Sequence, residues 1–494
     1  MEMHDCDVAV VGAGIMGCTM ARLLSRYRLD VTVVEASLDV GEGATKANSG
    51  IIHAGFHPRG GSLKGKSCVE GNAAYERIAQ ELDVPFLRTG ALMVAFHDEG
   101  VTKLREKRDR ALVNGAGELS IISGDEAREL EPLLSERVVA ALSAPSTGVI
   151  SPFELALATA RNAAVNGASF LFGFEVERIE RAGERWILHA ADGRRVRAPY
   201  VANMAGEEAA LLDAQVHPAD VVVRPRRGQY LVFDKQDAPG PDGAAARSIG
   251  RVLYQAQESD EGGTLLAPTA DGNLLAGPTS ENVRSFGDSA TTVEGIAHVR
   301  RVAEKLVPSL DLGRVITAFA GVRANIVNIE KERKDFVVRA SAEGFVSALG
   351  IKNPGMTSAP ALCSRALRLL CDAGLETVAD PSFDPKAQGG HRRPFLRCDA
   401  ARQREMLAYD ARFGHVVCRC EKVTEGDVRA CFREPLPPRT LDGVKRRLRC
   451  GMGRCQGGFC TPRIVDIMAD ELGCAPWEVM KSERGGRLVR RRVK

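Results

Sequence analysis

The stretch Asp7-Val-Ala-Val-Val-Gly12-Ala-Gly14-Ile-Met-Gly17 decides the fold of this chain of 494 residues. Residues 8–11 are apolar and mostly β-branched, which is typical of a buried parallel strand. Three glycines follow, residues 18–24 have helical periodicity, and residues 31–34 (Val-Thr-Val-Val) predict a second buried strand that ends at Glu35. The order strand, glycine-rich turn, helix, strand and acid predicts a Rossmann-type dinucleotide-binding unit.

Each glycine and the acid have a physical task in such a unit. Gly12 permits the tight turn, Gly14 lets the backbone approach a pyrophosphate, and Gly17 lets the helix pack close to the strand. Glu35 lies 18 positions after Gly17, near the offset at which a carboxylate hydrogen-bonds ribose hydroxyls, and it would repel the extra phosphate of NADP. FAD and NAD remain as candidate cofactors.

The composition is that of an ordinary globular protein. A hydrophobic content of 44% supports two or three domains with buried cores. The 67 Lys and Arg residues nearly balance the 64 Asp and Glu residues, so nucleic-acid binding is not expected. The sequence has no apolar stretch of about 18 residues and no basic region before its first apolar run, so we expect neither a membrane span nor a signal peptide.

A longer run then resolves the choice of cofactor. The segment Gly43-Ala-Thr-Lys-Ala-Asn-Ser-Gly-Ile-Ile-His-Ala-Gly-Phe56 resembles the second FAD-contacting segment of the D-amino-acid oxidase-like superfamily of flavoenzymes. It looks like the glycerol-3-phosphate oxidase/dehydrogenase and L-2-hydroxyglutarate dehydrogenase branches. The resemblance covers about residues 5–375, and it continues in Gly61-Ser-Leu-Lys64, Cys68-Val-Glu-Gly71, Asn203-Met-Ala-Gly206, Arg226-Arg-Gly-Gln229 and Gly350-Ile-Lys-Asn-Pro-Gly-Met-Thr357.

The resemblance implies a set of FAD-contacting residues spread over these segments. The loop at 350–355 opens a helix, so its N–H groups are expected to face the electron-rich end of the flavin; an ordinary helix cap is the alternative. The implied residues are Gly12, Gly14, Ile15, Met16, Gly17, Glu35, Ala36, Thr45, Asn48, Ser49, Gly50, Ile51, Val176, Ala205, Gly206, Gly321, Asn353, Gly355, Met356 and Thr357.

Three side chains are the candidates for chemistry beside the flavin. Oxidation of an alcohol needs a base for the hydroxyl proton, and His53 in the flavin-facing segment is suited to that role, with a structural histidine as the alternative. Arg323 follows the apolar run 315–320, where we expect a strand end, and Lys352 lies in the flavin loop. Both would bind an anionic substrate if they are not simply solvated charges. Arg226 and Arg227 are weaker candidates for the same role.

Five of the 13 cysteines lie within 43 residues near the C-terminus. Four of them follow the spacing Cys418-x-Cys420, 34 residues, then Cys455-x4-Cys460. This spacing resembles the bacterioferritin-associated ferredoxin-like [2Fe–2S] domain. The resemblance implies that these four thiols are the cluster ligands; zinc is the alternative metal, and a site without a cluster is a third reading. Cys450 departs from the pattern as a fifth thiol, which is either a spare or an alternative ligand. Thr424 and Asp427 form a helix-start signature, which predicts a helix directly after the first two cysteines.

Together these features predict an α/β fold. It comprises a Rossmann-type FAD-binding domain with an interleaved antiparallel-sheet substrate domain, plus a small C-terminal α-helical [2Fe–2S] domain. The expected oxidoreductase part spans 1–380, with FAD-binding segments at about 1–85, 145–215 and 315–380 and substrate-domain segments at about 86–144 and 216–314. A linker is expected at 381–412, the cluster domain at 413–475 and a basic tail at 476–494.

We therefore expect an FAD-dependent dehydrogenase of the glycerol-3-phosphate type. It would act on a small anionic hydroxy substrate and pass electrons through the cluster to an acceptor protein or a quinone-linked subunit. The alternatives are L-2-hydroxyglutarate oxidation, amine or amino-acid oxidation, a flavin-binding scaffold without turnover and an electron-transfer subunit. The expected location is cytoplasmic, and the basic tail either frays in solvent or contacts the inner face of the membrane.

Overall fold

The computed structural model describes residues 3–236, 248–256, 263–328, 335–387, 394–483, 486–489 and 491. Within these ranges, six strands form the central sheet, in the order β10-β3-β2-β14-β24-β23. Neighbouring strands are parallel except for β23 and β24, which form an antiparallel pair at one edge. The strands are β10 (Ser169–Phe172), β3 (Val31–Glu35), β2 (Val8–Val11), β14 (Tyr200–Asn203), β24 (Phe345–Leu349) and β23 (Val337–Ala342).

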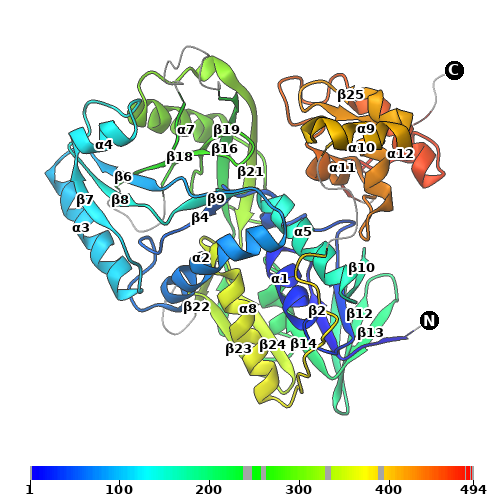
Figure 1. The fold of residues 1–494 in the computed structure, drawn as a ribbon. Coiled ribbons are helices and arrows are strands. Elements are labelled where there is room, and N and C mark those ends of the chain that lie inside the picture. Colours follow the sequence, from blue (N-terminus) through cyan, green and yellow to red (C-terminus); the bar gives the residue numbers. More distant parts are fainter. Residues whose placement is uncertain are drawn as a thin grey trace.

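Helices cover one face of this sheet and a smaller sheet covers the other (Figure 1). Val8 and Val10 of β2 pack with the helices, whereas Ala9 and Val11 face the second sheet, as the alternation of a strand requires. The helices are α1 (Ile15–Leu24), α5 (Pro152–Val165) and α8 (Gly355–Asp372), and α2 (Leu63–Glu81) packs on α8. The second sheet contains β1 (Met3–Asp5), β11 (Val176–Ala182), β12 (Arg185–Ala190) and β13 (Arg195–Ala198).

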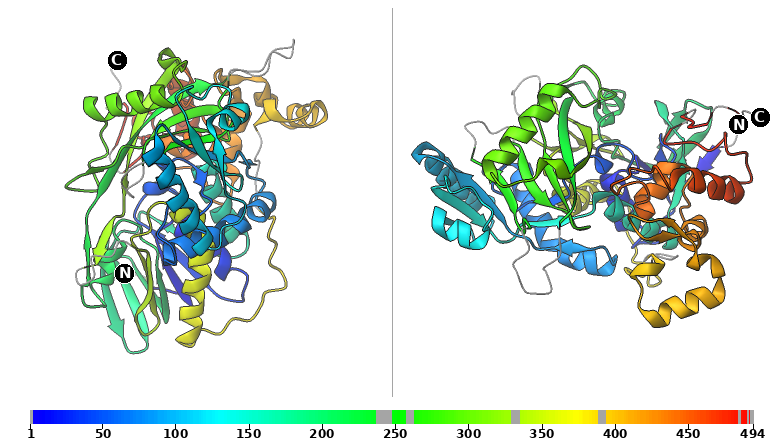
Figure 2. Two further views of the ribbon diagram at one scale, coloured as in Figure 1. Left: turned by 90° about the vertical axis from the view of Figure 1, so that its left-hand side faces the viewer. Right: turned by 90° about the horizontal axis from the view of Figure 1, so that it is seen from above.

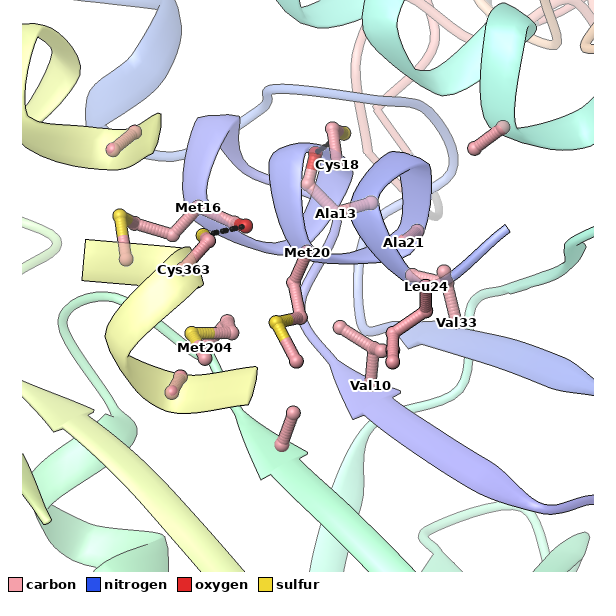
Figure 3. Packing of buried hydrophobic residues seen from close by; sticks show 14 of the residues in the cluster. Val10, Ala13, Met16, Cys18, Met20, Ala21, Leu24, Val33, Met204 and Cys363 are labelled. Carbon is pink, nitrogen blue, oxygen red and sulfur yellow. Dashed lines mark hydrogen bonds between the residues drawn. The ribbon is translucent and has the colours of Figure 1, made fainter. Parts of the chain in front are cut away.

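The predicted strand, turn, helix and strand at the N-terminus are confirmed as β2, α1 and β3. Figure 3 shows α1 packed through Met20 and Leu24 onto Val10 and Val33 of these strands. On its other side, the Cys363 thiol of α8 donates to the Met16 carbonyl at 3.4 Å. The glycine-rich turn is therefore held between a buried helix and a buried sheet.

A second, mostly antiparallel sheet forms the upper left part of the molecule in Figure 1. Its strands are β6 (Ala91–Ala95), β7 (Ser120–Ser123), β8 (Ala140–Ala144), β16 (Arg226–Lys235), β17 (Val252–Gln255), β18 (Leu265–Pro268), β19 (Asn273–Gly277), β20 (Glu281–Asn282) and β21 (Val315–Arg323). Helices α3 (Asp98–Val113), α4 (Gly124–Leu130) and α7 (Val293–Leu306) accompany it, and smaller elements are β4 (Ile51–Ile52), β5 (Phe86–Leu87), β9 (Gly148–Ile150), β15 (Val221–Val223), β22 (Ile326–Asn328) and α6 (Ala209–Asp213).

The strand that ends at Arg323 differs from the expectation. We expected residues from 315 onward to belong to the FAD-binding domain, but β21 pairs along its length with β16 of the antiparallel sheet. The apolar run predicted the strand correctly and its sheet wrongly. Its pairing partner β16 lies about 90 residues earlier, and the sequence of the strand itself does not indicate which strand it pairs with.

The cysteine-rich part folds as a separate lobe, drawn in orange beside the two sheets in Figures 1 and 2. Its elements are β25 (Val416–Cys418), β26 (Val423–Thr424), α9 (Ala400–Tyr409), α10 (Glu425–Ala430), α11 (Leu441–Leu448) and α12 (Thr461–Leu472). The predicted helix start is a capping box, in which the side chains of Thr424 and Asp427 bond each other's backbone N–H groups. The lobe packs on α5 through α11, and the Arg161 side chain of α5 pairs with Glu434.

The expected linker is folded over much of its length. Helix α9 and two short 3-10 turns, Phe395–Arg397 and Ala411–Gly414, pack Phe395, Met406 and Phe413 together. The Phe395 N–H also donates to Asp427 of α10 at 2.8 Å. This segment is polar and carries few apolar residues, so its composition resembles that of a linker. In the structure the buried side chains of Phe395, Met406 and Phe413 nevertheless pack into a small core of their own. Residues 388–393 of the expected linker and 484, 485, 490 and 492–494 of the basic tail lie outside the described residues.

No helix in the described part of the chain is both long and apolar enough to cross a membrane.

Candidate functional site

A cavity of about 1070 Å³ runs from the glycine-rich turn to the antiparallel sheet. It is lined by 17 of the 20 residues expected to contact FAD and by His53, Arg323 and Lys352. The expected contacts outside the lining are Gly17, Gly50 and Thr357. The sequence segments that resembled a flavoenzyme therefore meet around one elongated space.

The dinucleotide end of the cavity has the geometry that a pyrophosphate and a ribose require. Gly12 has φ +98°, and a Cβ added there would meet the Met204 carbonyl oxygen at 2.8 Å. A Cβ added at Gly17 would meet the Gly12 carbonyl oxygen at 1.7 Å, so Gly17 shapes the turn from behind. Both carboxylate oxygens of Glu35 accept backbone N–H groups, from Ala13 at 2.6 Å and from Ser37 at 2.7 Å. These bonds fix the carboxylate at the end of β3, beside the cavity.

His53 follows β4 and is held from several sides. Its backbone N–H donates to the Thr357 hydroxyl at 3.0 Å, and its carbonyl accepts from the Asn72 amide at 3.0 Å. On the ring, Nδ1 lies 3.3 Å from the Tyr254 hydroxyl and Nε2 lies 2.9 Å from Asn353 Nδ2. Because the amide nitrogen can only donate, it requires an unprotonated Nε2. Thr357 thus positions His53 from outside the cavity lining.

The electrostatic environment keeps the His53 ring neutral. Burial and the nearby Lys64 charge lower the pKa of His53 to about 3. An imidazole in this state is able to accept a proton and does not repel the cations around it. A bound anion near the ring would offset the positive field and make His53 a stronger base.

Arg323 ends β21, directly across from Arg226, which opens β16. Its guanidinium donates to the Thr279 carbonyl at 3.1 Å and to the Ser280 hydroxyl at 3.3 Å. These neutral partners orient the fork without cancelling its charge. Lys352 hydrogen-bonds the Asn325 side chain, which is also neutral.

Sequence reasoning missed Lys64 as a site residue. It lies in the first turn of α2 and lines the cavity, with its Nζ 5.5 Å from the centre of the Phe336 ring. Burial lowers the pKa of Lys64 to about 8, while the Asp335 carboxylate acts in the opposite direction. Within the described residues, neither Lys64 nor Arg323 forms an ion pair with a carboxylate. The segment 61–64 carried the resemblance, but nothing in its pattern separated Lys64 from a surface lysine.

Tyr254 and His57 also line the cavity without having been expected there. The Tyr254 ring packs edge-on against His57, with ring centres 4.8 Å apart, and its hydroxyl reaches His53. Tyr254 comes from β17, so only the folding of the antiparallel sheet over the cavity brings it to His53. The arrangement can bind a small anion between cations and take a proton from a hydroxyl held at His53.

The cysteine lobe places the four expected ligands in two pairs. Cys420 Sγ lies 3.7 Å from Cys455 Sγ, and the neighbouring thiols of Cys450 and Cys460 lower the pKa of Cys418. Two thiols to each iron is the requirement of a [2Fe–2S] cluster, so the donor set fits that group. A Cβ added at Gly453 would meet the Cys420 Cβ at 2.2 Å, which shows why glycine occurs in this loop.

Comparison with known proteins agrees with both parts of the chain. Residues 7–368 match the family model of the FAD-dependent oxidoreductases (DAO), and residues 416–470 match that of the BFD-like [2Fe-2S] binding domain. The chain is 37% identical over 487 residues to a glycerol 3-phosphate dehydrogenase of Caloramator mitchellensis, with 98% of each chain covered. It is 26% identical to a subunit of the anaerobic glycerol-3-phosphate dehydrogenase of Escherichia coli K12, covering 94% of this chain and 88% of that one.

A solved structure is similar to the oxidoreductase part. It is an L-alpha-glycerophosphate oxidase from Mycoplasma pneumoniae with FAD bound, which has a TM-score of 0.70 and 25% sequence identity. The match covers 78% of this chain and 99% of that one.

Proposed function

Because the chain belongs to the family of FAD-dependent oxidoreductases and carries a BFD-like [2Fe-2S] binding domain, we propose that it oxidises sn-glycerol 3-phosphate to dihydroxyacetone phosphate. The relatives named above as glycerol 3-phosphate dehydrogenases match this chain along both of its parts. The proposal also includes transfer of the electrons through the cluster to another protein.

One arrangement in the cavity supports this function above all. His53 Nε2 lies within hydrogen-bonding distance of Asn353 in the expected flavin loop. The cations Arg323 and Lys64 line the same space, and neither forms an ion pair in the described chain, although the Asp335 carboxylate accepts the backbone N–H of Lys64 at 3.0 Å. A hydroxyl and a dianion joined by a short carbon chain match a base and a group of cations placed in this way.

The side chains divide the chemistry between them. FAD, when bound, supplies the acceptor for the hydride. The guanidinium of Arg323 and the ammonium groups of Lys64 and Lys352 bind the phosphate. His53 accepts the hydroxyl proton at Nε2, in place of the Asn353 amide hydrogen, while Tyr254 holds Nδ1. The charge of the bound phosphate favours the imidazolium that forms.

The [2Fe–2S] cluster, when bound, supplies a one-electron relay. The chain's own part is to hold it beside the two sheets through the contacts of α11 and α5. The Escherichia coli relative is named as one subunit of its enzyme, which supports a partner that receives these electrons.

The test is an anaerobic titration of the oxidised holoenzyme with sn-glycerol 3-phosphate, followed by visible absorption. We expect the flavin absorption to bleach at stoichiometric substrate. L-2-hydroxyglutarate, added to a second sample, should leave it unchanged. Bleaching by L-2-hydroxyglutarate alone would make the dicarboxylate the substrate, and a flavin reduced by dithionite but by neither compound would favour an electron-transfer subunit.

A further inference from the structure

The two loops that carry the cluster ligands differ in how deeply they bury their thiols. Cys418 and Cys460 are buried in the lobe, whereas Cys420 is exposed and Cys455 is partly exposed. The pair Cys420 and Cys455, whose sulfurs lie 3.7 Å apart, therefore marks the edge of the cluster site that reaches solvent. An electron acceptor from outside the chain can approach most closely at this edge.

The surface around this edge is cationic. The ligand loops, residues 418–422 and 450–463, contain four basic residues, Arg419, Lys422, Arg454 and Arg463, all of which are exposed. Their one carboxylate, Glu421, is buried and is paired with Lys235 at 3.0 Å and Arg449 at 3.1 Å. The exposed face of the two loops thus presents positive charge with no carboxylate of its own.

Two of these cations have no ion-pair partner in the described residues. Arg454 pairs with Asp234 and Arg463 pairs with Glu425, but Arg419 and Lys422 form no ion pair there. Phe459 lies between Cys455 and Cys460 in the second loop, and its side chain is 77% exposed. An exposed aromatic side chain in segments that also carry exposed cations is consistent with a docking surface that has an apolar centre and a charged rim.

We propose that this face, formed by Arg419, Lys422, Cys420, Cys455 and Phe459, docks a one-electron carrier protein whose own redox centre is surrounded by acidic side chains. Charge complementarity selects such a partner and speeds its approach. The proposal rests on the dehydrogenase function proposed above and adds the exit surface and the charge of the acceptor.

The electron balance requires two encounters at this face for each turnover. Oxidation of one alcohol to a ketone releases two electrons and two protons. The electrons leave singly through the cluster and reduce two molecules of carrier, for example two ferric haems to ferrous haems, and the protons pass to solvent.

The experiment compares two probes with the same haem, native cytochrome c, which is basic, and fully succinylated cytochrome c, which is acidic. Holoenzyme reduced by sn-glycerol 3-phosphate is mixed with each in stopped flow at low salt and at 0.5 M salt. We expect the succinylated carrier to be reduced at least tenfold faster than the native one at low salt. That preference should disappear at high salt, because exposed charges are then screened.

Charge reversal tests the face directly. The double variant Arg419→Glu/Lys422→Glu should invert the preference, whereas Arg404→Glu, an exposed cation of α9 outside both loops, should retain it. Iron content and the visible spectrum of the variants establish that the cluster is still bound. Phe459→Ser should lower the rate with both probes, because it removes the apolar centre that they share.

Two results would overturn the proposal. One is an equal rate for both carriers in the wild type, and the other is a preference that survives the double reversal. Sedimentation with phosphatidylglycerol vesicles is the third measurement, since loss of vesicle binding in the double variant with unchanged carrier rates would assign the face to an anionic membrane. If sn-glycerol 3-phosphate fails to reduce the enzyme, dithionite replaces it, so that failure of the substrate assignment is seen separately from failure of the docking face.

Discussion

Arg447 of α11 donates to both carboxylate oxygens of Asp39, at 2.6 and 2.9 Å, although 408 residues separate them in the sequence. Both side chains are only 1% exposed. Burial alone would raise the pKa of Asp39, but the charge and hydrogen bonds of Arg447, with Arg446, lower it overall. Asp39 lies in the loop between Glu35 and Thr45, so the ion pair fastens the cluster lobe to the segment expected to hold the adenosine half of FAD.

Breaking this pair should loosen the lobe without removing the site in the cavity. In Arg447→Met the buried Asp39 carboxylate loses the partner that bonds both of its oxygens and keeps only Arg446, at 3.3 Å. Removing one partner of a buried ion pair typically costs about 3–5 kcal/mol. We expect normal bleaching of the flavin by substrate but slower reduction of the cluster, measured by stopped-flow absorption, and faster cleavage between the lobe and the sheets by trypsin.

Two further variants distinguish the effect of losing this ion pair from a general loss of stability. Asp39→Leu/Arg447→Met removes both charges and should recover part of the protease resistance. Arg404→Met, an exposed arginine of α9, should behave as the wild type. Cluster reduction at the wild-type rate in Arg447→Met would show that the pair does not position the lobe.

His53→Ala should slow flavin reduction by substrate by about 10²–10⁴-fold, since the hydroxyl proton then loses its proposed acceptor. The FAD content should stay near that of the wild type, because the residues at the dinucleotide end are untouched. Tyr254→Phe is the matched milder change: it removes the hydroxyl 3.3 Å from Nδ1 but leaves the ring, and a smaller decrease is expected. A His53→Ala enzyme reduced at the wild-type rate would assign the histidine a structural role.

Lys64 should give the enzyme a pH dependence of its own. Its pKa of about 8 lies below the usual value, so the ammonium loses its charge as the pH rises through about 8. The anionic substrate then binds more weakly, and kcat/KM of the free enzyme should fall above that pH. In Lys64→Met the value should be about 10–100-fold lower at pH 7 and no longer fall near pH 8, as expected for loss of a charged hydrogen bond.

The control for Lys64 is its exposed neighbour Lys66 in the same helix, and Lys66→Met should keep the wild-type profile. Lys64→Arg should keep the charge and shift the decline to higher pH. A wild-type profile that stays level between pH 7 and 9.5 would contradict the role of Lys64.

The parts of the fold and the site that the sequence predicts are those with a local signal. Backbone constraints at Gly12 and Gly17, the continuous apolar runs of β2 and β3 and the spacing of the cysteines all lie within short segments. Lys64 and Tyr254 reach His53 only through tertiary packing, and the partner of Arg447 is set by the docking of two domains. The sheet that contains β21 was misassigned for the same reason, since strand pairing is a long-range choice.

Gly17→Ala should abolish tight FAD binding by closing the turn from behind. The added methyl group would meet the Gly12 carbonyl oxygen at 1.7 Å, and neither backbone segment is free to move because α1 and β2 are both buried. We expect a decrease in stability of about 1–3 kcal/mol, measured by denaturant unfolding, and a purified protein with little flavin. Gly117→Ala, where a Cβ meets nothing within 4 Å, should keep both stability and flavin. Full FAD occupancy in Gly17→Ala would mean that the turn tolerates a side chain.

Cys450 is the fifth thiol of the lobe, and its position predicts a role different from that of the ligands. It is buried beside Cys418, whose pKa its thiol lowers as a hydrogen-bond donor would. Cys450→Ser keeps a donor and should retain two iron atoms per chain, whereas Cys455→Ser removes one of the four expected ligands and should lose iron.

In Cys450→Ala the donor is gone, so the cluster should stay bound but be harder to reduce, because hydrogen bonds to sulfur stabilise the reduced state. Redox titration followed by electron paramagnetic resonance measures the shift, and Cys474→Ser, a partly exposed cysteine outside the ligand loops, is the control. Loss of iron from Cys450→Ser with retention in Cys455→Ser would exchange the two roles and make Cys450 the ligand.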